Sequence, residues 1–109
     1  MNTQLLAMVR LNDPQLSWLA IECLLHCAEH PRTIQELQGL TGAANGQTNR
    51  AIRSLTVWWD AKGQKVVRPS LHLLQRRRRP KPNRGHRVHL TKAGAIFLHD
   101  AGCRISPGL

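Results

Sequence analysis

Positively charged side chains are concentrated in one short segment of this sequence. Residues 76–87 contain seven arginine or lysine residues among twelve, namely Arg76, Arg77, Arg78, Arg79, Lys81, Arg84 and Arg87. No aspartate or glutamate occurs between residues 61 and 99, so the neighbouring chain offers them no carboxylate partner. Guanidinium groups form paired hydrogen bonds with phosphate oxygens. The segment therefore predicts a contact surface for a polyanion.

A second group of side chains suited to hydrogen bonding precedes this segment. Gln47, Asn49, Arg50 and Arg53 fall within residues 41–59, a stretch that has no acidic residue. A merely solvated helix face, the alternative, normally mixes Glu with Lys. Asn and Gln can pair with adenine and Arg with guanine, each good pairing giving about 1–3 kcal/mol of discrimination. This polar edge predicts contacts with bases and phosphates.

The charge of the whole chain supports the same kind of partner. The 109 residues carry 16 Lys and Arg against 6 Asp and Glu, a formal net charge of +10. Residues 1–49 hold two basic and four acidic residues, whereas residues 50–109 hold fourteen and two. So high a charge on a small body is self-repulsive unless a polyanion relieves it. With 41% hydrophobic residues the chain can still form a core, and its length fits a single domain over residues 1–109.

Cysteine and histidine form a third candidate group, at Cys23, His26, Cys27 and His30. This spacing aligns them along one side of a helix, which is compatible with a metal site. A structural zinc needs four ligands, however, and one helix usually supplies two, so core packing is the favoured interpretation. We expect no metal and no cofactor. The dispersed acidic residues and the lack of a glycine-rich phosphate loop predict that the chain is not an enzyme.

The first predicted helix must support these groups. Asp13 and Pro14 predict its start, after an N-terminal arm over residues 1–12, and Pro31 predicts its end near residue 30. One apolar stripe comprises Leu16, Leu19, Ala20, Cys23, Leu24 and Cys27, and a second comprises Trp18, Ile21 and Leu25. The second stripe is covered either by the rest of the domain or by another subunit.

Two further helices carry the polar edge. Thr33 to Glu36 matches a capping box and predicts the start of a short helix. A turn of small residues at 41–46 leads to a helix that begins at Asn45 or Gly46 and is expected to reach residue 59, with Gly63 as its end. Its predicted apolar face comprises Thr48, Ala51, Ile52, Leu55 and Trp59. Two helices joined in this way are typical of a helix-turn-helix.

The period changes after residue 66. Residues 70–75 and 87–90 predict two strands that enclose the basic segment as a hairpin tip. Thr91 predicts the cap of a last helix with Ala93, Ile96 and Phe97 as its apolar face and Gly102 as its end, before a flexible tail over residues 103–109. The predicted fold is α+β, a winged helix-turn-helix of three helices followed by a β-hairpin wing and a C-terminal helix.

Residues 14–102 resemble the winged-helix transcriptional regulators, broadly the MarR-like and related prokaryotic or phage proteins. The stretch Thr48–Leu55 is similar to the recognition-helix pattern, and Arg87–Gly94 to the last wing strand and the start of the next helix. The resemblance implies DNA contacts at Arg50 and at Arg84 or Arg87. Residues 56–69 are longer than usual, the wing is more basic, and the terminal segments are short for a MarR-like dimer platform.

Together these features predict a sequence-specific regulator that binds double-stranded DNA, most simply a repressor, in the cytoplasm and associated with the nucleoid. The candidate DNA contacts are Gln47, Thr48, Asn49, Arg50, Arg53, Arg76, Arg77, Arg78, Arg79, Lys81, Arg84 and Arg87. The adjacent Trp58 and Trp59 and the second apolar stripe predict a homodimer. No membrane or small-molecule partner is expected. A DNA-architectural or replication and recombination accessory protein, and an arginine-rich RNA-binding adaptor, are the alternatives.

Overall fold

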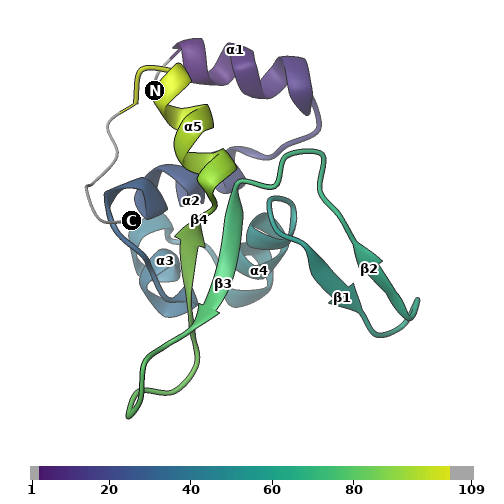
Figure 1. Cartoon of the computed structure of the whole chain (residues 1–109), viewed down its shortest axis with the longest axis vertical. Coiled ribbons are helices and arrows are strands. Elements are labelled where there is room, and N and C mark those ends of the chain that lie inside the picture. The colour runs from purple at the N-terminus through teal and green to yellow at the C-terminus, as the bar shows by residue number, and fades with distance from the viewer. Residues whose placement is uncertain (1–2, 104–109) are drawn as a thin grey trace.

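The computed structural model describes residues 3–103 and has an α+β architecture. In chain order its elements are α1 (Thr3–Asn12), α2 (Trp18–Glu29), α3 (Ile34–Thr41), α4 (Asn45–Arg53), β1 (Trp58–Asp60), β2 (Lys65–Val67), β3 (Leu74–Arg78), β4 (His86–Leu90) and α5 (Lys92–Asp100). Helices α2, α3 and α4 form the centre of the molecule, with α1 and α5 above them in Figure 1. The β3–β4 hairpin extends downward and the β1–β2 hairpin extends to the right.

The N-terminal segment is a helix rather than the predicted arm. Leu5 and Val9 of α1 are fully buried and belong to the same core as α2, α4 and the β3–β4 hairpin. Because these two residues lie four apart, they occupy one face of α1. No helix is predicted for this segment from the sequence, and the burial of Leu5 and Val9 in the common core shows that the helix is part of the fold. Within residues 3–103, no helix has the combination of length and apolar character required to span a bilayer.

Helix α2 starts later than predicted. Its N-cap is Ser17, whose Oγ accepts a hydrogen bond from the Ala20 N–H (3.2 Å), so Pro14 is outside the helix. Of the second apolar stripe, Ile21 is fully buried within the chain itself, while Trp18 remains 52% exposed. The burial of Ile21 removes part of the basis for the predicted homodimer, which stays a prediction.

The start of α3 confirms the predicted capping box. Thr33 Oγ1 accepts a hydrogen bond from the Glu36 N–H, and Glu36 Oε1 accepts one from the Thr33 N–H, each over 3.1 Å. The hydrogen bond from the Thr33 N–H lowers the pKa of the Glu36 carboxyl, since it favours the charged form. Gly42, at a φ of 75°, ends the helix in the left-handed conformation that glycine adopts without strain.

Helix α4 begins at Asn45, as predicted, but it ends at Arg53 instead of continuing to residue 59. Thr56 Oγ1 donates to the Ile52 carbonyl (3.0 Å) as the chain leaves the helix. Trp58 and Trp59, which were expected in the last turn of this helix, belong to strand β1 instead. The residue with a left-handed backbone near the expected helix end is Gln64, at a φ of 49°, in the connection between β1 and β2. Gly63 is therefore not a helix cap.

Both sheets are two-stranded antiparallel hairpins. The β1–β2 hairpin pairs Trp58 with Val67, Trp59 with Val66 and Asp60 with Lys65. Strand β3 starts at Leu74 rather than residue 70, so Arg76, Arg77 and Arg78 lie in the strand and not in the predicted tip. The bridge Arg32↔Val88 adds one residue of antiparallel pairing to β4, through hydrogen bonds of 3.1 and 2.6 Å.

Helix α5 packs the root of the β3–β4 hairpin against the core. Thr91 caps it by accepting a hydrogen bond from the Gly94 N–H (2.9 Å), as predicted. Its buried face carries Gly94 and Leu98, whereas Ile96, expected inside, is 52% exposed. Gly94 lies so close to the Leu73 carbonyl that a Cβ at this position would collide with the backbone.

The predicted end of this helix at Gly102 is confirmed by a left-handed φ of 76°. Ala93, also expected on the apolar face, is exposed. The buried face of α5 is thus shifted by about one residue from the predicted face, from Ala93 and Phe97 to Gly94 and Leu98. Of the predicted tail only Cys103 is described; it packs against the core, and residues 104–109 lie outside the described residues.

Candidate nucleic-acid interface

Helix α4 presents a polar edge to solvent, as the sequence predicts. Gln47, Arg50 and Arg53 are exposed and Asn49 is half-buried. The Gln47 side-chain oxygen accepts a hydrogen bond from the Ala44 N–H (3.1 Å), which caps the helix and fixes this side chain. The exposed groups near the helix start are amides and those near its end are guanidinium groups, so the edge has both donors and acceptors.

Thr48 does not belong to this edge. Its side chain is fully buried, and its Oγ1 donates to the Ala44 carbonyl within the helix (2.9 Å). A fully buried hydroxyl that is bonded inside its own helix has no access to a base or phosphate. The prediction that Thr48 contacts DNA is therefore wrong, and the residue instead helps to pack α4 against the core.

The polar edge is bonded directly to the β3–β4 hairpin. Arg76 Nη2 donates to Asn49 Oδ1 over 2.9 Å. Asn49 Nδ2 in turn donates to the carbonyl oxygen and to Oδ1 of Asn45, both at 3.0 Å. Both ends of the Asn49 amide are thus used inside the protein. The chain Asn45–Asn49–Arg76 therefore links the hairpin to the polar edge of α4.

Positive charge is crowded where these elements meet. Partial burial, and then the nearby charge of Arg53, lower the pKa of the Arg76 guanidinium. Arginine stays charged in proteins, so this shift indicates that burial and the neighbouring charge of Arg53 make the position of the Arg76 cation electrostatically unfavourable. Arg53 is also placed over the Trp58 ring, 4.6 Å from its centroid, which joins the end of α4 to strand β1. A bound anion would relieve the repulsion between the two arginines.

The register of β3 and β4 divides the basic residues between two faces. Paired residues share a face and successive residues alternate. One face carries Arg76, Arg78, His86 and Val88, and the other carries Gln75, Arg77, Arg87 and His89. Because Arg76 points toward α4, the second group points away from it. The structure therefore does not bring Arg77 and Arg87 together with the polar edge of α4.

Arg77 and Arg87 are instead directly opposite each other across the hairpin. Like charges in this arrangement destabilise a sheet. His89 is on the same face, and its pKa is lowered by burial and then by the charges of Arg77 and Arg87. This outer face is thus an unneutralised cationic surface, and it favours the uncharged form of His89.

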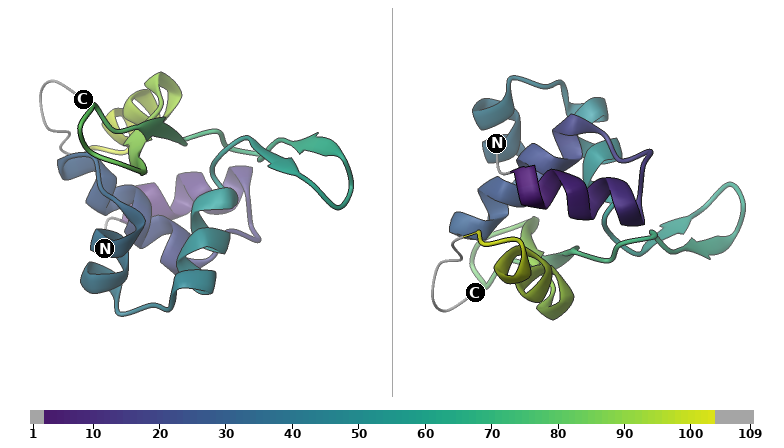
Figure 2. Two further views of the ribbon diagram at one scale, coloured as in Figure 1. Left: turned by 90° about the horizontal axis from the view of Figure 1, so that it is seen from below. Right: turned by 90° about the horizontal axis from the view of Figure 1, so that it is seen from above.

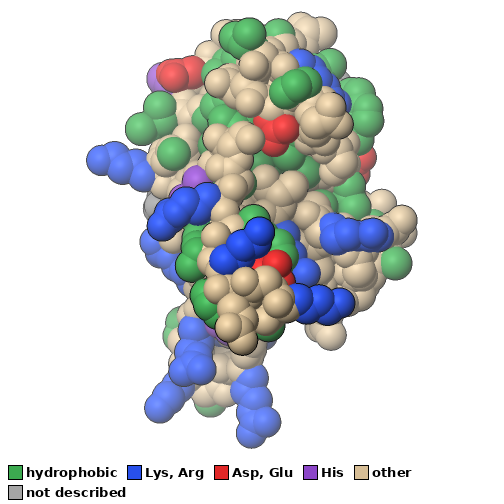
Figure 3. Space-filling view, turned by 90° about the vertical axis from the view of Figure 1, so that its right-hand side faces the viewer, with side chains coloured by type: hydrophobic (Ala, Val, Ile, Leu, Met, Phe, Trp, Pro, Cys, Tyr) green, Lys and Arg blue, Asp and Glu red, His purple; other side chains and the backbone are tan. Residues whose placement is uncertain are grey.

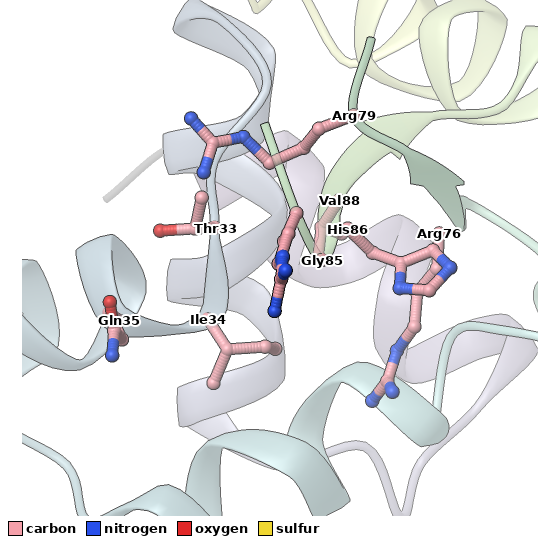
Figure 4. Close-up of a pocket in the computed structure, with 9 residues that line it drawn as sticks. Thr33, Ile34, Gln35, Arg76, Arg79, Gly85, His86 and Val88 are labelled. Carbon is pink, nitrogen blue, oxygen red and sulfur yellow. The ribbon is translucent and has the colours of Figure 1, made fainter. Parts of the chain in front are cut away.

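A hollow of about 390 Å³ opens between the start of α3 and the β3–β4 hairpin. Its lining comprises Thr33, Ile34, Gln35, Arg76, Arg79, Arg84, Gly85, His86 and Val88, with no acidic residue. Figure 4 shows that these side chains come from two sides of the hollow, the helix start and the hairpin. The Nε atom of Arg79 is buried without a hydrogen-bond partner within the described part of the chain. The hollow has the charge and the donors to receive a phosphate.

Lys81 and Arg84 occupy the β3–β4 connection, where both are exposed. Figure 3 shows the Lys and Arg side chains gathered over the lower part of one face, around the hairpins, with few near α1 and α5. The predicted contacts thus form one group around α4 and the inner face of β3–β4, a second at the tip, and a third on the outer face.

Some basic residues in this region were missed by the sequence analysis. Lys62, Lys65 and Arg68 are exposed on or beside the β1–β2 hairpin. They were missed because residues 58–67 were interpreted as a helix end and a turn. The signal available in the sequence was the segment Lys65–Val67, since two consecutive valines favour a strand over a turn.

The cysteines of α2 belong to the core. Cys23 and Cys27 are fully buried. Burial raises the pKa of the Cys23 thiol to about 11 and that of the Cys27 thiol to about 12, so both are uncharged near neutral pH. Residues 3–103 contain no group of three or more His, Cys, Asp or Glu side chains placed to hold a metal ion.

No family model matches this chain, and no curated protein is significantly similar to it. The chemistry of its own surface is therefore the basis for inferring its partner.

Proposed function

We propose that this chain is a winged helix-turn-helix protein that binds double-stranded DNA, with α4 in the major groove and the β3–β4 hairpin as the wing. The element order supports this fold: α2, the single bridge residue Arg32, α3, α4 and then β3–β4. A helix-turn-helix inserts its second helix into the major groove. Helix α1 and the β1–β2 hairpin are additional to the winged helix-turn-helix elements.

The observation that carries the proposal is the Arg76–Asn49 hydrogen bond of 2.9 Å. It holds the basic hairpin beside the exposed edge of α4, so that the helix and the hairpin can contact one duplex together. The unneutralised charge around this bond supports an anionic partner. Arg50 and Arg53 are exposed and can form hydrogen bonds with guanine or phosphate. Arg79 and Arg84 are suited to bind phosphates beside the groove.

The proposed role is sequence-specific regulation of transcription, most simply by occupying a promoter. Arg50 is the strongest candidate for a base contact because it is exposed and its side chain makes no hydrogen bond or ion pair within residues 3–103. The tip and outer-face arginines contact the backbone and supply affinity that is independent of sequence. Association with the nucleoid follows from this role.

The test is a selection of bound sequences from a random duplex library at about 150 mM salt, where longer-range charge interactions are screened. We expect an enriched motif with the unsubstituted protein. Arg50→Ala should flatten the sequence preference, whereas Arg78→Ala should weaken binding to every duplex and lower the salt slope by about one. Lys92→Ala, which removes an exposed charge at the start of α5, is the matched control.

The alternatives have distinct outcomes in the same experiment. Duplex binding without an enriched motif, equally weakened by Arg50→Ala and Arg78→Ala, would indicate a DNA-architectural or recombination accessory protein. Tighter binding to structured RNA than to duplex DNA would indicate an RNA-binding adaptor. Absence of binding to either nucleic acid would overturn the proposal.

A further inference from the structure

We infer that the β1–β2 hairpin is a second DNA-binding arm, which contacts the phosphate backbone beside α4, next to the β3–β4 hairpin. This inference rests on the proposed function and adds a binding surface to it. The arm consists of residues 58–68, with Lys62, Lys65 and Arg68 as its phosphate-binding residues.

The first argument is the position of the arm on α4. Its strand β1 begins five residues after the end of α4, and both views in Figure 2 show the hairpin projecting from the body of helices. The Arg53–Trp58 contact of 4.6 Å attaches its inner face to the end of the helix. A hollow of about 370 Å³ between them is lined by Arg50, Arg53, Ser54, Trp58, Val67 and Pro69. The arm thus flanks the polar edge of α4.

The second argument is that both basic hairpins adjoin α4. Asn49 bonds to Arg76 of the β3–β4 hairpin, while Arg50 and Arg53 adjoin Trp58 of the arm. The major groove is about 12 Å wide and has a phosphate backbone along each side. A helix inserted in that groove therefore lies close to phosphates, and here the arm adds cations to those that the β3–β4 hairpin already places beside the helix.

The third argument is the charge of the arm. Lys62, Lys65 and Arg68 are exposed, and none of them takes part in an ion pair among the described residues. The single carboxylate, Asp60, uses its Oδ1 to accept a hydrogen bond from the Lys62 backbone N–H (3.1 Å). It is also the cross-strand neighbour of Lys65. The arm therefore keeps a net positive charge, carried by exposed side chains.

The apolar outer face of the arm also has a place in this inference. Trp59 and Val66 are paired across the strands and are 60% and 51% exposed. Such a pair could serve contact between two copies of the chain. Two copies joined here would bring their arms, each with three cations, against each other, and like-charge repulsion opposes that. A nucleic-acid backbone, which places apolar sugars between phosphates, is complementary to both the apolar pair and the cations.

The hollow between the two hairpins supports the same partner. It has a volume of about 390 Å³ and is lined by Arg53, Thr56, Val57, Trp58, Trp59, His72, Gln75 and Arg76. The lining combines two arginines with two tryptophans and contains no acidic side chain. An anionic partner is therefore favoured on the side of the arm that faces the β3–β4 hairpin as well as at its end.

The experiment compares the unsubstituted protein with Lys62→Ala/Lys65→Ala/Arg68→Ala on the selected duplex. Each phosphate contact contributes about 0.9 to the salt slope, so we expect the slope to fall by about 2.7 and affinity at 150 mM salt to fall about 100-fold. Hydroxyl-radical footprinting should lose protection on one flank of the site only. Lys92→Ala should change neither result. Because all three residues are exposed, circular dichroism should be unchanged.

The outcomes separate the inference from the proposed function. If the unsubstituted protein binds the duplex and the triple variant has the same slope and footprint, the arm inference is overturned and the proposed function stands. If the unsubstituted protein binds no duplex DNA, both fail. If Trp59→Ser/Val66→Ser halves the sedimenting mass without changing DNA binding, the face joins two copies of the chain and the inference is again overturned.

Discussion

The two hairpins that adjoin α4 are built in different ways. The β3–β4 hairpin has strands of five residues, and Leu74, Val88 and Leu90 place its root in the core. The β1–β2 hairpin has strands of three residues, none of them buried, and is attached to α4 by the Arg53–Trp58 contact. Isolated two-stranded hairpins are marginally stable in water. One hairpin is therefore held by burial of its root in the core, whereas the other has no buried strand residue and contacts α4 through Trp58.

The largest expected effect tests the difference in burial. Leu74→Ala removes a fully buried side chain at the root of β3, so the free energy of unfolding should fall by about 2–5 kcal/mol. Val66→Ala, on the exposed face of β2, should change it by less than about 0.5 kcal/mol. Urea denaturation followed by circular dichroism measures both. Similar losses in the two variants would contradict the contrast between the hairpins.

A smaller effect tests the attachment of the β1–β2 hairpin. Trp58→Leu removes the ring beneath Arg53, and a cation–π contact at an exposed site contributes about 0.5–1 kcal/mol. Amide hydrogen exchange in β1 and β2 should therefore become about 2- to 5-fold faster, while exchange in β3 and β4 stays unchanged.

Trp59→Leu is the control for this prediction, because Trp59 is on the opposite face of the same strand. It makes an equal change in side-chain type next to Trp58. Equal acceleration in both variants would show that strand propensity, and not the contact with Arg53, stabilises the hairpin.

The smallest effect concerns the like-charge pair on the outer face of the β3–β4 hairpin. Arg77→Thr relieves the repulsion from Arg87 and should stabilise the fold by about 0.2–1 kcal/mol. The same change should lower the salt slope of DNA binding by about one, if Arg77 contacts a phosphate. Thermal denaturation and salt titration measure the two effects.

Arg78→Thr is the matched variant on the inner face, opposite His86. It should weaken DNA binding without the gain in stability, because no arginine lies across from it. A stability gain of equal size in both variants would indicate general charge reduction instead of the specific Arg77–Arg87 pair.

Local signals in the sequence identified some elements and missed others. The capping box at Thr33 and the cap at Thr91 rest on contacts between residues three apart, so sequence alone predicts them. Helix α1 and strand β1 were not predicted, and strand β2 has only the weaker signal of two consecutive valines, Val66 and Val67. Strands of three residues are too short for alternation to be distinguished from a helix end, and the two adjacent tryptophans were assigned to the helix for that reason.

The candidate site shows the same division. The exposed arginines and the polar edge of α4 follow from charge and helical spacing. The Arg76–Asn49 bond joins residues 27 apart, and the separation of Arg77 from Arg76 depends on the pairing register. Thr48 was misplaced because a short polar side chain suits both a buried helix face and a contact surface. These features require the tertiary structure.

The contact between Gly94 and the Leu73 carbonyl has a consequence for the tolerance of the chain to substitution. A side chain at Gly94 would push α5 away from the root of β3, and β3 carries the Arg76 bond to α4. The placement of the basic hairpin therefore depends on the absence of a side chain at Gly94, although Gly94 is not one of the proposed DNA contacts. Gly39 and Gly46 have open space around them, so the surface near α4 is freer to diversify than the interior that supports it.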